Sequence, residues 1–155
     1  MFEKTVWQEI SLIHKKRQSQ IVGKFKHIDN DDMCPDESQH VEYAEVYRAT
    51  KNTEILGVED FLPWNVEYAN QNKTFKRQFK KPEYGLSVFT NLDSLKDTVE
   101  RIPALAERTN AYAKGFTTIK RGISLKEDKK HHVEYYLYDY ENNSPKDDFE
   151  IIEVT

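Results

Sequence analysis

An arginine in a predicted strand is the first residue of this sequence that could carry chemistry. Arg48 follows Tyr47 in residues 41–50, VEYAEVYRAT, where apolar and polar residues alternate as they do in a strand. An inward-facing guanidinium needs an anionic partner, either a carboxylate of the protein or a bound phosphate. Structural ion pairs are the commoner partner, and both interpretations of Arg48 stay open.

A histidine pair, His131 and His132, opens the clearest predicted strand, residues 131–140 or HHVEYYLYDY. Adjacent residues of a strand face opposite sides, so the two imidazoles cannot bind one metal ion from a regular backbone. One of them can face a cleft, where a pKa near neutral suits proton transfer or a hydrogen bond to phosphate. The alternative is a polar strand start at the edge of a sheet.

Alternation divides this predicted strand into two faces. The more apolar face, which we expect in the core, carries His131, Val133, Tyr135, Leu137 and Asp139. The other face carries His132, Glu134, Tyr136, Tyr138 and Tyr140. Tyrosine offers a ring for stacking and a hydroxyl for hydrogen bonds, which indicates a binding surface, but it is also a good strand former.

The other nucleophiles have weaker sequence contexts. Ser87, in the predicted strand of residues 84–90 (YGLSVFT), lies in neither a G-x-S-x-G elbow nor an S-x-x-K motif, which argues against a serine hydrolase. Cys34 lies in the acidic residues 29–39, whose charge raises the pKa of a thiol. Those residues do not match an EF-hand, and a single cysteine excludes Cys-based metal sites, so we predict no metal.

A basic aromatic stretch, KTFKRQFKK over residues 73–81, is the candidate for nucleic-acid contact. Its cations are Lys73, Lys76, Arg77, Lys80 and Lys81. The formal net charge of the chain is −4, and five charges are strongly screened at cellular salt. A solvated charged face is the usual meaning of such a run, and a phosphate contact is the alternative.

Composition bounds the class of protein. The chain has 155 residues and a rich aromatic content of nine tyrosines, eight phenylalanines and two tryptophans. A chain of this length buries roughly 68–70% of its unfolded surface, as one domain does. Its five glycines form neither a dinucleotide fingerprint nor a P-loop. No apolar run approaches the roughly 20 residues of a membrane span, so we expect a soluble cytoplasmic protein with no membrane partner.

Periodicity predicts the elements that must position these residues. Helices are expected over residues 2–18, 58–70, 92–102 and 104–108, with Asp60 and Asn91 as caps of the second and third. Strands are expected over residues 41–50, 84–90, 116–125, 131–140 and 148–154. Three strands close the order, which predicts an α+β fold with an antiparallel or split sheet, about three helices, and the N-terminal helix packed on the sheet. We expect a single domain over residues 1–155, with 1–40 as an extension of helix and acidic loop and 41–154 as the α+β core.

Four short motifs resemble, in their order, those of a family of small uncharacterised bacterial and phage proteins. They are the pair Tyr47-Arg48, DFL at residues 60–62, GLSVF at 85–89 and HHV at 131–133. The resemblance covers residues 41 to 154. It departs from the family pattern where Lys130 replaces a glycine and Val133 a threonine.

The same order is distantly similar to the ADP-ribosyltransferase-like fold, including its RNA 2′-phosphotransferase-like branch. That resemblance implies NAD bound in the cleft of a split sheet, with Arg48 as the phosphate or ribose anchor. Ser87 would take the second-strand position, and His132 or Glu134 would complete the site. The sequence lacks the Q/E-x-E context of a catalytic glutamate, so the phosphotransferase-like branch, which relies on arginine and histidine, suits Arg48 with His131 or His132 better.

Two hypotheses of function follow, and the sequence leaves open whether the protein is an enzyme. The first is a cleft that binds NAD or another phosphorylated nucleotide, as in a transferase. Its ligand contacts would be Arg48, Tyr47, Tyr84, Ser87 and Tyr136, and its catalytic candidates His132, Glu134 and His131. The second is a non-enzymatic inhibitor or immunity-type protein of a phage or mobile element, which would bind a basic host protein through the acidic loop or C-terminus.

Overall fold

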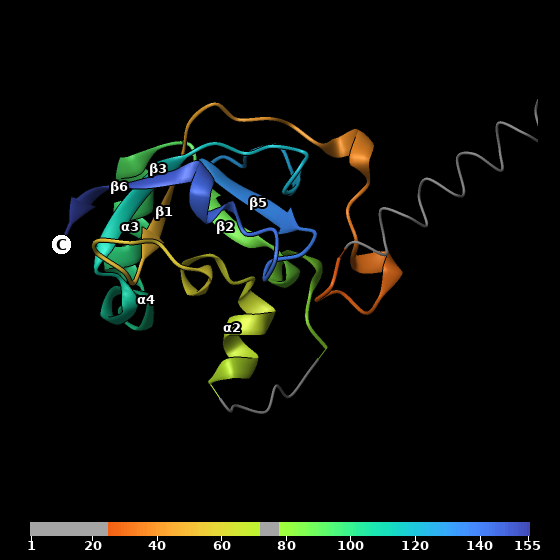
Figure 1. Cartoon of the computed structure of the whole chain (residues 1–155), viewed down its shortest axis with the longest axis horizontal. Helices are drawn as coiled ribbons and strands as arrows, with labels where there is room; N and C mark the ends of the chain where they lie inside the picture. The colour runs from red at the N-terminus through yellow and green to blue at the C-terminus, as the bar shows by residue number, and fades with distance from the viewer. Residues whose placement is uncertain (1–24, 72–77) are drawn as a thin grey trace, which may run out of the picture.

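A computed structural model of the chain describes residues 25–71 and 78–155, which form an α+β fold around a six-stranded antiparallel sheet (Figure 1). The strand order is β4-β5-β2-β1-β3-β6. The strands are β1 (Val46–Thr50), β2 (Leu86–Phe89), β3 (Ala111–Gly115), β4 (Gly122–Ser124), β5 (His132–Leu137) and β6 (Phe149–Val154). The predicted α+β class with an antiparallel sheet is confirmed, and β1 and β2 occupy the centre of the sheet.

Helices follow β1 and β2 in the chain. They are α2 (Trp64–Asn70), α3 (Leu92–Arg101) and α4 (Pro103–Arg108). As predicted, Asn91 caps α3, because its Oδ1 accepts a hydrogen bond from the backbone N–H of Ser94 at 3.0 Å. Leu95 and Val99 are the buried residues of α3. Figure 1 shows α3 and α4 together beside β1, whereas α2 projects away from the sheet. None of the helices in the described residues is long and apolar enough to cross a membrane.

The helix predicted over residues 58–70 is two separate pieces. A 3-10 helix, η3 (Val58–Phe61), is followed by α2, and Pro63 lies at the break as the N-cap of α2. Leu62 is extended, as residues before proline usually are. Asp60 does not cap a long helix. It lies within η3 and is buried, with 2% of its surface exposed. Its carboxylate accepts backbone hydrogen bonds from Lys51, Asn52 and Gly57 at 2.8, 3.2 and 2.9 Å.

The strand predicted over residues 116–125 is confirmed only for β4, which spans Gly122–Ser124. A further strand, β3, precedes the predicted range. It was not predicted, because its sequence AYAKG is poor in residues that favour strands. Gly122 marks a close approach of two strands, since a Cβ there would lie 2.1 Å from the carbonyl oxygen of Tyr136. The irregularity of the sheet lies between Tyr112 and Ala113, opposite β6.

Most residues of β5 are covered on one face or the other by other elements. The predicted core face is confirmed for Val133, Tyr135 and Leu137, which pack with Phe61 and Phe149. The opposite face is not an open tyrosine surface. Its residues Tyr136 and Tyr138 are buried in a second cluster with Phe25, Ile28, Tyr84 and Ile123.

The face of the sheet that carries Tyr136 is covered from two sides. The second cluster covers the β4–β5 end, while α3 covers the β1–β3 part through Phe89, Leu95, Val99 and Tyr112. Figure 1 shows residues 25–45 running along the side of the sheet away from α3 and α4. Ser87 and His132 lie on this same face between the two coverings, because His132 stands opposite Phe89.

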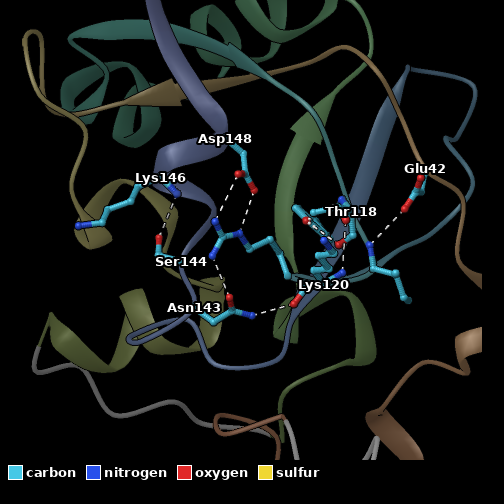
Figure 2. Close-up of polar contacts among 10 residues, drawn as sticks. Glu42, Thr118, Lys120, Asn143, Ser144, Lys146 and Asp148 are labelled. Carbon is cyan, nitrogen blue, oxygen red and sulfur yellow. Dashed lines mark hydrogen bonds and ion pairs between the residues drawn. The ribbon is translucent and has the colours of Figure 1, made fainter.

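A polar network joins the connection between β3 and β4 to the residues that precede β6 (Figure 2). Arg121 donates from Nε to Asp148 Oδ2 at 3.0 Å and from Nη1 to Asn143 Oδ1 at 2.8 Å. Asn143 in turn donates from Nδ2 to the carbonyl oxygen of Lys120 at 2.8 Å (Figure 2). The hydrogen bond to Asp148 raises the pKa of Arg121, so this charge pair ties the β3–β4 connection to the start of β6.

Two predicted segments lie outside the described residues. One is the helix over residues 2–18, and the other comprises Lys73, Lys76 and Arg77 of the basic stretch. Lys80 and Lys81 are described, and Lys81 opens the 3-10 helix η4 (Lys81–Tyr84).

Candidate functional site

A cavity of about 590 Å³ lies over the centre of the sheet beside α3. This central cavity is lined by residues of β1, β2 and β5 and by α2, α3 and α4. Its apolar lining includes Trp64, Phe89, Leu95, Ile102 and Leu105. The volume lies in the range of about 300–1,000 Å³ that small-molecule sites occupy.

Ser87, His132 and Asp128 line the central cavity together. His132 Nε2 lies 2.9 Å from Ser87 Oγ, and His132 Nδ1 lies 3.7 Å from Asp128 Oδ2. In the β2–β5 register His132 stands opposite Phe89, two residues beyond Ser87. Ser87 and His132 are therefore diagonal neighbours on one face of the sheet, within reach of each other's side chains.

A tight turn before β5 brings Asp128 to the imidazole. The backbone N–H of Asp128 donates to the carbonyl oxygen of His132 at 3.0 Å, and His131 has a left-handed φ of 64°. Asp128 Oδ1 accepts the backbone N–H groups of Lys130 at 2.8 Å and His132 at 3.0 Å. These bonds occupy Oδ1, and Oδ2 is the oxygen that faces the imidazole.

The charges of this group follow from its surroundings. Burial lowers the pKa of His132 below its ordinary value of 6.5, while the negative charges of Asp128 and Glu134 act against that shift. Burial acts to raise the pKa of Asp128, but the backbone hydrogen bonds from His132 and Lys130 hold it below its ordinary value. At pH 7 the site therefore holds a neutral imidazole beside an ionised carboxylate. With its proton on Nδ1, toward Asp128, the imidazole can accept a hydrogen bond from Ser87 through Nε2.

Arg48 belongs to β1 and pairs with Ala113, so alternation places its side chain on the opposite face of the sheet from Ser87 and His132, over the ring of Phe61. β1 and β2 pair at Tyr47 and Phe89, and beside that pair the guanidinium bridges the strands. Its Nη1 donates to the carbonyl oxygen of Ser87 at 2.8 Å, and its Nε donates to that of Asp60 at 2.6 Å. Burial lowers the pKa of Arg48 to about 10 despite the charges of Glu67 and Asp60, so it stays protonated at pH 7.

Two groups of charged residues line different parts of the central cavity. Glu67 of α2 forms ion pairs with Lys51 at 3.1 Å and with Arg108 at 2.8 Å, so one carboxylate is shared by two cations of the lining. Arg101 and Lys130 line the central cavity and also an adjoining hollow near His131. These two cations lie where an anionic group of a ligand could enter.

The cavity brings together part of the predicted site. Arg48, Ser87 and His132 line it. Of the described residues, Tyr47, Tyr84, Glu134, Tyr136 and His131 are not part of that lining. Tyr84 and Tyr136 are buried, and the hydroxyl of Tyr136 donates to Glu134 at 2.9 Å. Tyr47 donates its hydroxyl to Glu45, and His131 contacts Glu127 at 3.2 Å outside the strand.

Sequence reasoning missed several residues of the cavity, namely Asp128, Glu67, Arg101, Arg108 and Lys130. Only Asp128 had a local signal, because the run EDKKHH over residues 127–132 places an acid four residues before each histidine. Lys130 lies in the same run, whereas Glu67, Arg101 and Arg108 come from helices whose packing against the sheet has no short sequence motif.

The acidic residues 29–39 form two short 3-10 turns, η1 (Asp31–Met33) and η2 (Glu37–Gln39). Burial, with the charge of Asp31, raises the pKa of Cys34 to about 11, as expected for an unreactive thiol. A search of residues 25–71 and 78–155 finds no group of three or more side chains arranged to hold a metal ion.

Comparison of the chain with protein-family models, with curated proteins and with solved structures finds no match. The similarity to the ADP-ribosyltransferase-like fold therefore stays a prediction.

Proposed function

We propose that the central cavity binds a phosphorylated, nucleotide-like small molecule, with NAD among the candidate ligands. The observation that carries the proposal is the meeting of an apolar lining with cations and a histidine–serine pair in one cavity of about 590 Å³. An aromatic or heterocyclic ring suits the surface of Trp64 and Phe89. A phosphate suits the guanidinium of Arg101 and the ammonium of Lys130.

The proposal assigns Arg48 a different role from that of a direct anchor. Two of its nitrogens donate to backbone carbonyl oxygens, so it contributes positive charge and holds the strands in place. Glu134 accepts from Tyr136, and this engagement favours the arginine and histidine chemistry of the phosphotransferase-like branch over a glutamate-dependent transferase.

Isothermal titration calorimetry tests the proposal. NAD, ADP-ribose and ATP are titrated into the native protein and into the Arg101→Ala and Lys130→Ala variants, with Lys120→Ala as the matched control. Lys120 is exposed in the β3–β4 connection and does not line the cavity. Each cavity variant should weaken binding about tenfold or more, because hydrogen bonds to charged groups contribute about 1.5–3 kcal/mol. Absence of binding for all three ligands, or equal affinities in all variants, would rule the proposal out.

A second candidate function, the binding of a host protein, is favoured by the edge strand β6. Ile152 and Val154 are 42% and 57% exposed there, and Glu150 and Glu153 are exposed beside them. An edge strand can pair with a strand of a partner. The substitution Ile152→Lys should then abolish capture of a stoichiometric partner from host lysate, while His132→Ala should leave it intact.

A further inference from the structure

We propose that Ser87 is a nucleophile and His132 its general base, with Asp128 as a positioning residue, and that the central cavity transfers a phosphoryl group from its ligand to Ser87. This inference rests on the proposed function, because it names the reaction of the ligand that the cavity binds. No serine motif in the sequence indicates it.

The three side chains are arranged as an activated serine requires: the serine contacts the base, and the base faces the carboxylate. Ser87 Oγ lies 2.9 Å from His132 Nε2, within the 2.6–3.2 Å reach of a general base. Asp128 Oδ2 lies 3.7 Å from the other ring nitrogen and can orient the imidazole. Ser87 is exposed in an otherwise buried strand, so its hydroxyl is open to a ligand.

The surrounding groups support this division of roles. The charged and titratable groups around His132 are Asp128 in the turn, Glu134 on β5, and Lys130 and Arg101 on the cavity wall. Asp128 and Glu134 favour the protonated imidazole, and burial opposes it more strongly, so the pKa of His132 lies below its ordinary value. His132 is therefore available as a base at neutral pH.

The cations of the cavity favour a phosphoryl group as the electrophile. A phosphoryl group carries negative charge on its non-bridging oxygens during transfer, and cations stabilise that charge. Arg101 and Lys130 provide cations in the lining of the same cavity. Arg48 adds a second support, because its hydrogen bond to the carbonyl oxygen of Ser87 fixes the backbone of the nucleophile.

The reaction balances without a further reactant in its first step. Ser87 Oγ attacks the phosphorus of a phosphate ester or anhydride, the Oγ–P bond forms, and the bond from phosphorus to the leaving oxygen breaks. The proton of Ser87 passes to His132 Nε2 and then to the leaving oxygen. Water attacks the phosphoserine in the second step, loses its proton to His132 and releases inorganic phosphate, and the proton returns to Ser87 Oγ.

A fluorophosphonate probe tests the nucleophile directly, because an activated serine attacks its phosphorus and releases fluoride. Intact-protein and peptide mass spectrometry should find one label, on Ser87, in the native protein. Ser87→Ala should abolish it, and His132→Gln should slow labelling by about 100-fold or more, as expected for the loss of a general base. Ser94→Ala, in the adjoining hollow, is the matched control and should label at the native rate. No label, a label elsewhere, or a native rate in His132→Gln would overturn the proposal.

The pH dependence of labelling tests the positioning role of Asp128. The rate should rise with pH as His132 loses its proton. Because the charge of Asp128 favours the protonated imidazole, Asp128→Asn should move the midpoint of that rise to lower pH, which a purely structural change would not do. An unmoved midpoint would remove Asp128 from the proposal.

Acid-quenched incubation with ATP tests the phosphoryl assignment. We expect phosphoserine at Ser87 in the native protein and none in Ser87→Ala. Fluorophosphonate labelling without any phosphoserine would overturn phosphoryl transfer. If Ser87→Ala still binds the ligands by calorimetry while the native protein takes no label, this inference fails and the proposed binding function stands.

Discussion

Two backbone carbonyl oxygens hold the guanidinium of Arg48 at the junction of β1 and β2. One belongs to Ser87 and the other to Asp60, which lie 39 and 12 residues away in the chain. A charged donor at this position satisfies carbonyl groups that a looser strand pairing would leave unbonded. Arg48 therefore supports the strand on which the serine lies, besides lining the cavity.

Arg48→Ala should lower the free energy of unfolding by about 1.5–3 kcal/mol, because two charge-assisted hydrogen bonds are lost and the acceptor in buried Asp60 is left without this donor. Lys114→Ala is the matched control on the neighbouring strand. Its ammonium is largely exposed and lies 3.5 Å from Glu45, and such pairs contribute about 0–1 kcal/mol. Urea denaturation measures both changes, and equal losses in the two variants would contradict a structural role for Arg48.

The β4–β5 hairpin shows how an element depends on one small residue. β4 pairs with β5 from Gly122 opposite Leu137 to Ser124 opposite Tyr135. At Gly122 the backbone of β5 comes so close that a Cβ would lie 2.1 Å from the carbonyl oxygen of Tyr136 and 2.9 Å from the Cα of Leu137. Both obstacles are backbone atoms, which cannot move as the end of a side chain can.

Gly122→Ala should destabilise the protein by about 1–3 kcal/mol, because the hairpin must open to admit the methyl group. Gly85→Ala is the matched control, since its Cβ would meet the carbonyl oxygen of Pro82 at 3.4 Å and a tyrosine ring at 3.5 Å. We expect a change of less than about 1 kcal/mol there. Thermal or urea unfolding of both variants checks this, and a Gly122→Ala protein as stable as the native one would contradict the close approach of β4 and β5.

Over the whole molecule, segments that are distant in the chain cover one face of the sheet and leave its centre open. Phe25 and Ile28 pack over the β4–β5 end, and Leu95 and Val99 of α3 pack over the β1–β3 part. The central cavity lies against the α3 covering, and residues of η3 and α2 such as Asp60 and Trp64 also line it. The packing also buries two imidazoles. This burial lowers the pKa of both His27 and His132.

Stability should therefore fall as the pH decreases from about 7.5 to 5.5. Both histidines titrate near pH 6.5 in the unfolded chain, but their pKa values are lower in the folded protein. In this window the unfolded chain binds protons that the folded protein does not, so the free energy of unfolding decreases with falling pH. Urea denaturation across the window measures the slope. The double variant His27→Gln, His132→Gln should flatten it, and an unchanged slope would contradict the prediction.

Local patterns in the sequence were sufficient for several elements. The cap Asn91 and the spacing of Leu95 and Val99 predicted α3, and alternation predicted which face of β5 enters the main core. The α+β class with an antiparallel sheet followed from the order of such segments. These features depend on residues a few positions apart, so their physical cause is present in a short window of sequence.

The central cavity was decided only by the tertiary structure. Ser87 and His132 are 45 residues apart, and their contact depends on the pairing and register of β2 with β5. Tyr136 shares the face of His132, as a residue of a binding surface would, yet remote residues such as Phe25 bury it. Local sequence determines which way a side chain alternates, but the pairing of strands and the packing of distant segments decide whether it meets solvent, core or a partner. For this reason the fold class could be predicted from the sequence, whereas the contact of serine, histidine and aspartate depends on the folded sheet.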